Sequence, residues 1–366
     1  MAFINRVVVA DVRNIRNATL EIDKPINLIY GSNGSGKTSL LECFHILALG
    51  RSFRGTRIKP VINHDAQHCV IYGEVTSLAG RNSKLGIKKA LSGDTLVRMD
   101  GETARNLSEL AKKIPLQVLN SDGFLLLTGS PKLRRQMLDW GVFHVEHSFL
   151  ELWRRLQRAL KQRNSLLRRD RIAETEISPW NREIIEVGTE IDGLRQSYLT
   201  EFEPIFQSVL ATLSDAMPPI RLSYYKGWDT KSTLAEVFDK SRSRDEQLGY
   251  TQFGPHRADM RLKTGGYNAG DILSRGQQKL VVAALRLSQG KLLEQLAGEP
   301  CVYLIDDLPA ELDARHRIRL INLLLSMNCQ SFITGVDKNE LLAIFDSPSQ
   351  VAVFHVEHGQ INEDNS

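Results

Sequence analysis

The chain has 366 residues, enough for two or three domains, and its 42% hydrophobic and 25% charged residues are typical of a soluble globular protein. Four scattered cysteines without a C-x-x-C pair indicate neither a zinc site nor a disulfide framework. The absence of a signal peptide and of an apolar run of about 20 residues predicts a cytoplasmic protein. The net charge of +4 is too small to identify a nucleic-acid partner, so the position of the charges has to decide that question.

The first strong signal is a phosphate-binding loop of the pattern G-x-x-x-x-G-K-[ST]. An apolar strand is expected over residues 26–30 and a helix over residues 39–47, so bound phosphates would lie at a helix N-terminus. Glycines let backbone N–H groups turn toward phosphate oxygens, Lys37 supplies a positive charge, and the Thr38 hydroxyl is placed to bind Mg²⁺. The expected nucleotide-binding residues of this segment are Gly31, Ser32, Asn33, Gly34, Ser35, Gly36, Lys37, Thr38 and Ser39.

Two short basic segments follow, at residues 51–59 and 131–135. Basic segments at the ends of helices and strands are common positions of contacts with nucleic-acid phosphates. No basic stretch is interleaved with aromatic residues, the pattern that stacks single-stranded bases, so the backbone of duplex DNA is the favoured partner. The candidate DNA-binding residues are Arg51, Arg54, Arg57, Arg134 and Arg135.

Helical periodicity dominates the middle of the chain. From Phe149 to Leu167 apolar residues recur at spacings of three and four, and after a break at residues 178–180 a second run extends from Ile184 to Val209. The two runs predict a short antiparallel helical hairpin with arms of about 20–30 residues, reaching about 30–45 Å. The other face of the first arm is rich in arginine, which indicates either a solvated helix face or a surface for DNA phosphates.

A second motif, at residues 273–279, precedes another expected helix. Ser274 is placed to cap that helix, and Gly276 lets a phosphate approach the backbone ahead of Gln277. A capped helix without a ligand would have the same local sequence. The position of the motif, about 30 residues before a pair of acidic residues, favours a role in nucleotide binding.

The acidic pair follows an apolar strand expected at residues 301–305. Such a continuous apolar run is typical of a strand that is covered on both faces. Asp306 would hold Mg²⁺, and Asp307 would polarise the attacking water as a general base. The alternative is a buried strand that merely ends in a helix-capping acid. Together with the phosphate-binding loop, the pair predicts a catalytic site formed by Lys37, Asp306 and Asp307.

These motifs together resemble the ATP-binding-cassette (ABC) ATPases. The resemblance implies that the segment from Ser274 to Gln277 acts on the nucleotide held by a second copy, so that ATP joins two copies head to tail. It also implies that residues 309–313 form the loop at the dimer seam and that a γ-phosphate sensor lies at or near Thr334, where many members carry histidine. Gln117 is a candidate for the glutamine that links Mg²⁺ to the helical lobe, or else a strand glutamine without that role.

Lys37 and Ser274 are roughly 235 residues apart, which favours the chromosome-and-repair branch over transporter ATPases. The chain is similar, over nearly its whole length, to the RecF family of bacterial recombination mediators, which is related to SMC heads. The resemblance implies a weak ATPase that acts as a switch, an ATP-driven homodimer on duplex DNA near single-strand gaps, and action with RecR and RecO in loading RecA. The similar segments are residues 14–17, 50–54, 127–139, 161–164, 254–257 and 273–277.

We therefore predict an α/β fold, an ABC-type P-loop ATPase head with an inserted helical lobe that carries a short antiparallel helical hairpin. Residues 1–130 and 245–366 should form the ATPase lobe, the second part with the signature motif and acidic pair, and residues 131–244 the helical lobe. The expected cofactors are ATP and Mg²⁺. The alternatives are an ATPase subunit that docks a protein partner through its helical lobe, and a scaffold that binds nucleotide without hydrolysis, which the acidic pair opposes.

Overall fold

The structure is a computed structural model and describes residues 3–104, 106–345 and 350–364. The chain divides into two compact units. Unit 1 comprises the chain up to Gly123, Val209–Asp215, and the chain from Lys279 onward; unit 2 comprises Phe124–Ser208 and Ala216–Gln278. Among the described residues, no helix has both the length and the apolar character needed to cross a membrane.

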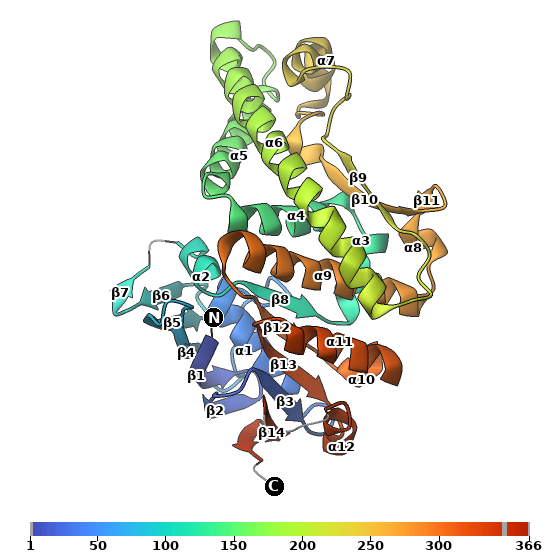
Figure 1. Cartoon of the computed structure of the whole chain (residues 1–366). Coiled ribbons are helices and arrows are strands. Elements are labelled where there is room, and N and C mark those ends of the chain that lie inside the picture. The colour runs from blue at the N-terminus through green and yellow to red at the C-terminus, as the bar shows by residue number, and fades with distance from the viewer. Residues whose placement is uncertain (1–2, 105, 346–349, 365–366) are drawn as a thin grey trace. The chain divides into compact units, whose positions relative to one another are not determined.

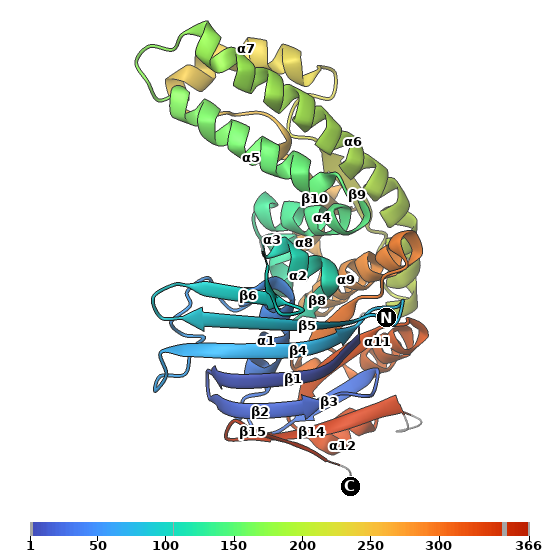
Figure 2. The same cartoon turned by 90° about the vertical axis from the view of Figure 1, so that its left-hand side faces the viewer.

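One layer of unit 1 is an antiparallel sheet with the strand order β2-β1-β4-β5-β6-β7 (Figure 2). Buried and exposed residues alternate along β5, so one face of the sheet packs on the core and the other faces solvent. The short helix α2 (Ser108–Lys113) follows this sheet. The strands are β1 (Phe3–Val12), β2 (Ile15–Glu21), β4 (His68–Thr76), β5 (Asn82–Ala90), β6 (Thr95–Met99) and β7 (Glu102–Thr103).

The second sheet of unit 1 has the order β15-β14-β3-β13-β12-β8 and is parallel except for β15. Every residue of β12 and β13 is buried, as expected for parallel strands covered on both faces. The strand expected at residues 26–30 is confirmed. The strands are β3 (Ile26–Tyr30), β8 (Leu116–Leu119), β12 (Val302–Ile305), β13 (Gln330–Gly335), β14 (Val351–Glu357) and β15 (Gln360–Glu363).

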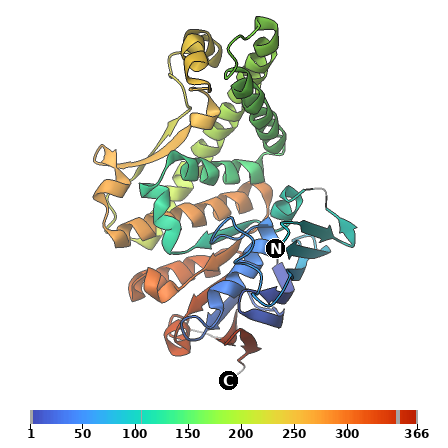
Figure 3. The same ribbon diagram turned by 180° about the vertical axis from the view of Figure 1, so that it is seen from behind.

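Helix α1 (Lys37–Leu49), blue in Figure 3, packs between the two sheets of unit 1 and shares one hydrophobic core with both. The rings of Phe44 in α1 and Phe332 in β13 stack with centroids 4.0 Å apart. Gln330 joins the sheets directly, because its buried amide exchanges two hydrogen bonds with the backbone of Ile4. The last turn of the long helix that ends at Leu213 also belongs to unit 1. Further helices that lie wholly or partly in unit 1 are α9 (Arg275–Ala297), α10 (Leu308–Glu311), α11 (Ala314–Ser326) and α12 (Lys338–Leu342).

Unit 2 is mainly helical and also holds a small antiparallel sheet in the order β11-β10-β9 (Figure 1). Its strands are β9 (Arg221–Tyr225), β10 (Asp259–Thr264) and β11 (Tyr267–Asn268). The helices are α3 (Leu125–Thr128), α4 (Pro131–Val145), α5 (Phe149–Leu166), α6 (Glu174–Leu213), α7 (Leu234–Leu248) and α8 (Ala269–Ile272). A 3₁₀ turn lies at Pro255–Arg257, and another, at Ser121–Phe124, precedes α3 and spans the boundary at which the chain passes from unit 1 to unit 2.

The expected helical hairpin is formed by α5 and α6, which lie side by side in Figures 1 and 2. Ion pairs and hydrogen bonds join them in antiparallel order: Arg155 contacts Glu183 at 2.7 Å, and Arg163, farther along α5, contacts the earlier Asn181 at 2.6 Å. The side chains of Ile177 and Ile184 on α6 are fully buried. The hairpin is thus held by a buried apolar seam and by polar contacts across it.

The expected break at residues 178–180 is wrong, because α6 begins at Glu174 and continues through Pro179. A proline inside a helix removes one backbone hydrogen bond. Pro179 lies near the start of α6, and burial of the apolar stripe of the helix outweighs the loss of this bond. The predicted arm length of about 20–30 residues is close to the length of α5 and wrong for α6. Helix α5 has 18 residues, whereas α6 has 40 and is about 60 Å long.

The compact units differ from the predicted division of the chain in three segments, of which one, residues 124–130, belongs to unit 2 rather than to the predicted ATPase lobe. Residues 245–278 belong to unit 2 rather than with the nucleotide-binding part, and residues 209–215 belong to unit 1. Long-range contacts explain the placement of residues 245–278, because β10 pairs with β9 and Asp259 forms an ion pair with Arg134 of α4. The assignment of a function to each part of the chain stays a prediction.

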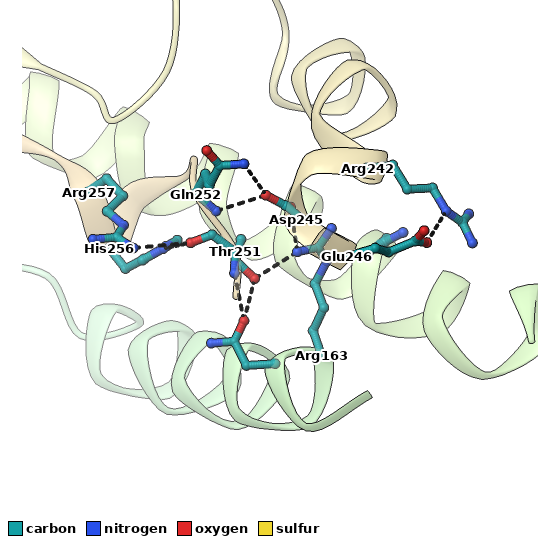
Figure 4. Close-up of polar contacts among 10 residues, drawn as sticks. Arg163, Arg242, Asp245, Glu246, Thr251, Gln252, His256 and Arg257 are labelled. Atoms are coloured by element: carbon teal, nitrogen blue, oxygen red, sulfur yellow. Dashed lines mark hydrogen bonds and ion pairs between the residues drawn. The ribbon is translucent and has the colours of Figure 1, made fainter. Parts of the chain in front are cut away.

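A buried polar network ties α5, α6 and α7 to the loop that follows α7 (Figure 4). The side chains of Arg163 and Asp245 are both fully buried and lie 2.8 Å apart. The Nη1 atom of Arg163 also donates to the Thr251 hydroxyl at 2.8 Å, and Asp245 accepts from both the backbone and the side chain of Gln252. Breaking such a buried ion pair from one side is expected to cost about 3–5 kcal/mol.

His256 lies at one edge of this network (Figure 4). Its Nε2 lies 3.1 Å from the carbonyl oxygen of Thr251, and since a carbonyl only accepts, Nε2 carries the proton. The Nδ1 atom is buried without a hydrogen-bond partner among the described residues. Burial lowers the pKa of His256 to about 4, and the nearby guanidinium groups of Arg257, Arg135 and Arg163 lower the pKa in the same direction. The imidazole is therefore neutral in the folded protein at neutral pH.

We predict that His256 makes the folded protein less stable in acid. The unfolded chain takes up a proton near the ordinary histidine pKa of about 6.5, whereas the folded chain does so only near pH 4, where its pKa lies. The contribution of this group is fully present above pH 6.5 and declines as the pH falls toward 4, by about 3 kcal/mol in total. Denaturant unfolding at pH 7, 6 and 5 measures the decline.

The matched variants are His256→Gln, which retains an amide donor for the Thr251 carbonyl, and His147→Gln, which alters an exposed histidine of the same unit. The first should show a smaller loss of stability between pH 7 and 5 than the unsubstituted chain, and the second should show the same loss. An unchanged pH profile in His256→Gln would contradict the prediction.

Candidate nucleotide-binding site

The loop between β3 and α1 has the conformation that its glycines permit. Gly31, Gly34 and Gly36 have φ values of 152°, 79° and 126°, in the range that side-chain-bearing residues rarely adopt. A Cβ atom on Gly31 would lie 2.2 Å from the carbonyl oxygen of Val356, so close packing requires glycine there as well. The helix α1 begins directly after this loop at Lys37. The loop N–H groups therefore gather at a helix N-terminus, which is an anion-binding arrangement.

The lysine of the loop is largely buried and bonds to the loop itself. The Lys37 ammonium donates to the carbonyl oxygens of Gly31 at 2.7 Å and Ser32 at 2.9 Å. Burial lowers its pKa, while the charges of Asp307 and Asp306 act in the opposite direction. The ammonium is thus held between the loop and the acidic pair.

Four polar groups meet where the parallel strands end. The Thr38 hydroxyl lies 3.0 and 3.1 Å from the two carboxylate oxygens of Asp306, and the Thr334 hydroxyl lies 2.9 Å from one of them. The backbone N–H of Asp307 donates to the Thr334 hydroxyl at 2.7 Å. Asp307 has a φ of 52°, a left-handed conformation that is strained for a residue with a side chain. Thr334 therefore helps to hold Asp307 in a conformation that it would rarely adopt alone.

These groups surround a pocket of about 540 Å³ in unit 1. Of the predicted loop residues, Gly31, Ser32 and Ser35 are not part of the pocket wall, and they shape the loop behind it. Ser121 is a wall residue that the sequence motifs did not indicate, and Glu311 comes from the segment 309–313, which was expected at the dimer seam rather than in the pocket. The pocket is lined by Asn33, Gly34, Gly36, Lys37, Thr38, Ser39, Arg54, Ser121, Asp306, Asp307, Ala310, Glu311 and Thr334.

The signature motif lies in unit 2 and caps helix α9. The Gln277 backbone N–H donates to the Ser274 hydroxyl at 3.3 Å, and the Ser274 N–H donates to the Gln277 side-chain oxygen at 2.9 Å. This reciprocal pair is a capping box, which confirms Ser274 as the helix cap. Gly276 is exposed, and a Cβ atom on it would meet no atom within 4 Å. Packing within the chain therefore does not explain a glycine at this position.

The chain matches the model of the RecF/RecN/SMC N terminal domain over residues 3–362. It is 48% identical over 360 residues to the DNA replication and repair protein RecF of Stutzerimonas stutzeri (strain A1501), covering 98% of this chain and 97% of that protein. The RecF of Pseudomonas entomophila (strain L48) is also 48% identical over 360 residues, covering 98% of each chain. The chain belongs to the RecF family of DNA replication and repair proteins.

Solved structures agree with the RecF assignment. A structure of the recombination mediator protein RecF with ATP, in the RecFOR pathway, superposes with a TM-score of 0.88 at 25% identity, covering 99% of this chain and 97% of that chain. The Smc head domain of Pyrococcus furiosus, bound to the C-terminal domain of ScpA, superposes with a TM-score of 0.61 at 15% identity, covering 100% and 96%. The fold is that of an ABC-type ATPase head, as the sequence motifs predicted.

Gln117 does not reach the pocket of this RecF-family chain. It pairs in register with Tyr303 of β12, three residues before Asp306, which places it about 10 Å back from the edge where the pocket lies. Its amide is buried between Gln289 at 3.1 Å and Arg286 at 2.8 Å. The proposed link to Mg²⁺ is therefore not retained. Ser121, beyond the end of β8, is the residue of this segment that lines the pocket.

Arg54 lies in the nucleotide pocket, whereas the sequence indicated a DNA contact. Its guanidinium is 3.9 Å from the fully buried carboxylate of Glu42 on α1, which also binds Arg13 at 2.5 and 2.9 Å and the Ser52 hydroxyl at 2.5 Å. Glu42 thus organises the loop that carries Arg54. No sequence motif marks Glu42; its signal is a carboxylate between the apolar neighbours Leu41 and Cys43 on α1.

Arg134 and Arg135 are committed to contacts inside unit 2. The Arg134 guanidinium binds the Asp259 carboxylate at 2.8 and 3.2 Å and the carbonyl oxygen of Gly129 at 2.9 Å. Arg135 donates to the carbonyl oxygen of Ala258 at 2.8 Å, and burial lowers its pKa. Since contacts within unit 2 hold both guanidinium groups, we withdraw both residues from the candidate DNA surface. Arg51 and Arg57 are exposed and remain candidates.

We predict that Thr334→Val lowers the free energy of unfolding by about 1–3 kcal/mol, because the Asp307 N–H and an Asp306 oxygen each lose a hydrogen-bond partner. Thr334→Ser keeps the hydroxyl and is the matched control, with the smaller loss of one buried methyl group. Denaturant unfolding without nucleotide measures both. Equal stability of the valine variant and the unsubstituted chain would show that the hydroxyl does not hold Asp307.

Proposed function

We propose that this protein is an ATP-dependent DNA-binding switch of recombinational repair and replication restart. In this proposal ATP and Mg²⁺ bind at the pocket of unit 1, ATP closes a homodimer on duplex DNA near single-strand gaps, and weak ATP hydrolysis releases it. The observation that carries the proposal is the convergence of Lys37, Thr38, Asp306 and Asp307 on one pocket. The similarity to RecF proteins named for DNA replication and repair, and to a RecF structure with ATP, supports the same function.

The residues of the pocket fit a magnesium nucleotide. The Thr38 hydroxyl and the Asp306 carboxylate form an oxygen donor set of the kind that Mg²⁺ prefers when it also binds phosphates and waters. When bound, Mg²⁺ would neutralise charge that develops on the β- and γ-phosphates. Lys37 would bind the same phosphates through its ammonium, and Asp307 would accept a proton from the attacking water. An aspartate at this position reaches less far than a glutamate, which is consistent with slow turnover.

The features of the signature motif support its action on a second copy of the chain. The exposed Gly276 leaves its backbone open to an incoming phosphate, and the capped N-terminus of α9 provides N–H groups for an anion. Asp313 caps α11 through the His316 N–H at 3.0 Å, and its side chain is 66% exposed, as a residue at a dimer seam would be before assembly. The proposed trans-acting residues are therefore Ser274, Gly276 and Gln277.

We predict that Lys37→Met abolishes ATP binding and that Ser274→Arg preserves ATP binding but prevents dimer formation. The arginine would place a bulky side chain where the γ-phosphate of the other copy approaches the helix. Equilibrium nucleotide binding and light scattering, each with ATP and with ADP, measure the two effects. The control is Ser243→Arg, at an exposed serine on α7. Normal ATP-driven dimers of Ser274→Arg would overturn the assignment of the motif to the second copy.

One face of α5 offers a surface for DNA phosphates. Arg158 and Lys161 are exposed and lie three residues apart, so they share one stripe of the helix. Arg155 and Arg163 on the same helix are instead engaged in ion pairs with acidic residues. We therefore assign DNA contacts to the exposed stripe, together with Arg51 and Arg57. RecR and RecO are the proposed protein partners, with RecA loading as the outcome.

We predict that a gapped duplex binds more tightly with ATP than with ADP or without nucleotide, and that Lys37→Met removes the difference. Fluorescence anisotropy of the labelled duplex over a range of salt concentrations measures both affinity and the number of phosphate contacts. The double variant Arg158→Glu/Lys161→Glu should lower the slope of log K against log salt by about two, one for each lost phosphate contact.

Lys231→Glu reverses an exposed charge of unit 2 outside this stripe and is the control for the DNA experiment. It should leave the salt slope unchanged. DNA binding that is absent, or that is indifferent to nucleotide, would contradict the proposed switch. That result would favour the alternative function, in which the helical unit docks a protein partner.

A further inference from the structure

The phosphate-binding loop is held from behind by two segments that are far from it in the sequence. The carbonyl oxygen of Ser35 accepts one hydrogen bond from the Asn14 side-chain amide at 2.8 Å and a second from the Gly359 backbone N–H at 2.8 Å. Asn14 lies in the turn between β1 and β2, and Gly359 lies in the turn between β14 and β15. Neither residue lines the nucleotide pocket.

These two hydrogen bonds set the direction of the next backbone N–H. In a planar trans peptide the C=O of one residue and the N–H of the following residue point in opposite directions. When Asn14 and Gly359 hold the Ser35 carbonyl on the outer side of the loop, the Gly36 N–H is directed to the opposite side. Gly36 is a wall residue of the pocket, and the loop N–H groups there are the donors for phosphate oxygens.

The Asn14 side chain also contacts the first turn of α1. Its oxygen accepts from the Ser39 hydroxyl at 3.0 Å, while its amide nitrogen donates to the Ser35 carbonyl. Only this orientation of the amide group satisfies both partners, since a carbonyl oxygen can only accept. Asn14 therefore bridges the loop and the helix that together form the phosphate cradle.

Close packing leaves little freedom in this arrangement. A Cβ atom on Gly359 would lie 2.1 Å from the carbonyl oxygen of Asn14, and one on Gly36 would lie 3.0 Å from its side-chain nitrogen. The Asn14 side chain itself is exposed, so its burial does not stabilise the core. Asn14 is exposed, yet both of its amide atoms bond to the phosphate-binding segment. A role in shaping the binding site therefore explains this asparagine better than a role in stabilising the core.

We propose that Asn14 is a positioning residue for the nucleotide, which orients the Ser35–Gly36 peptide so that the Gly36 N–H faces the α- and β-phosphates. The inference rests on the proposed binding of ATP at this pocket. It assigns Asn14 an effect on nucleotide affinity without contact with the reacting γ-phosphate. Because the α- and β-phosphates are common to ATP and ADP, the effect should be equal for both.

The test is the affinity of Asn14→Asp for ATP and for ADP, measured by titration calorimetry with Mg²⁺. The aspartate has the same shape and still accepts from Ser39, but its carboxylate repels the Ser35 carbonyl where the amide donated to it. We expect Kd to rise about tenfold for both nucleotides, as for the loss of one hydrogen bond to a charged group. In ATP hydrolysis KM should rise by the same factor while kcat is retained.

Asn17→Asp is the matched control. Asn17 is exposed on β2, three residues after Asn14, and its replacement by aspartate introduces the same negative charge. It should bind both nucleotides like the unsubstituted chain. Asn14→Ala provides a second variant without the added charge, and it should also raise the Kd for both ATP and ADP. The unfolding temperature without nucleotide should be the same in all four proteins, which separates positioning from a general loss of structure.

Three results would overturn the inference. They are unchanged Kd values in both Asn14→Asp and Asn14→Ala, a rise in Kd for ATP but not for ADP, or a fall in kcat at constant KM. The failure of the proposed function is distinguishable, because in that case the unsubstituted chain and Asn17→Asp would bind no nucleotide.

Discussion

The candidate nucleotide site depends on the parallel pairing of β3, β13 and β12. Because the carboxyl ends of parallel strands lie at one edge of a sheet, this pairing brings together three loops that are far apart in the chain. The Thr38 hydroxyl and the Asp306 carboxylate, 268 residues apart, are thereby placed 3.0 Å from each other. Thr334 enters from the strand between them. Without that strand order the phosphate-binding loop would have no acidic partner, whatever its own conformation.

A second layer of contacts holds the groups at this edge in conformations that they would not keep alone. The Thr334 hydroxyl receives the N–H of the strained Asp307, Glu42 anchors the loop of Arg54, and the Ser35 carbonyl is held from outside the pocket. Each contact fixes the direction of a donor or acceptor before a ligand arrives. Such preorganisation lowers the ordering cost of binding.

Several arginine side chains of unit 2 form ion pairs and hydrogen bonds within the unit itself. Arg163 pairs with Asp245 and Arg134 with Asp259, while the almost fully buried Arg195 binds Asp139 and the carbonyl oxygen of Pro255. These contacts join segments of the chain that resemble the RecF family outside the nucleotide motifs. The positive charge that unit 2 leaves for the proposed DNA contacts is therefore smaller than a count of its arginines suggests, and the part assigned to those contacts lies on the exposed stripe of α5.

The sequence by itself determined the phosphate-binding loop, the strand before the acidic pair, the capped helix at Ser274 and the presence of a helical hairpin. These features depend on neighbouring residues, whose spacing and backbone preferences are visible in a local window. Only the tertiary structure decided that Gln117 faces Arg286 rather than Mg²⁺, that Arg134 binds Asp259 rather than DNA, and that α6 continues through Pro179. In each of these cases the outcome depends on which distant segment supplies the partner or the buried surface, and local sequence does not contain that information.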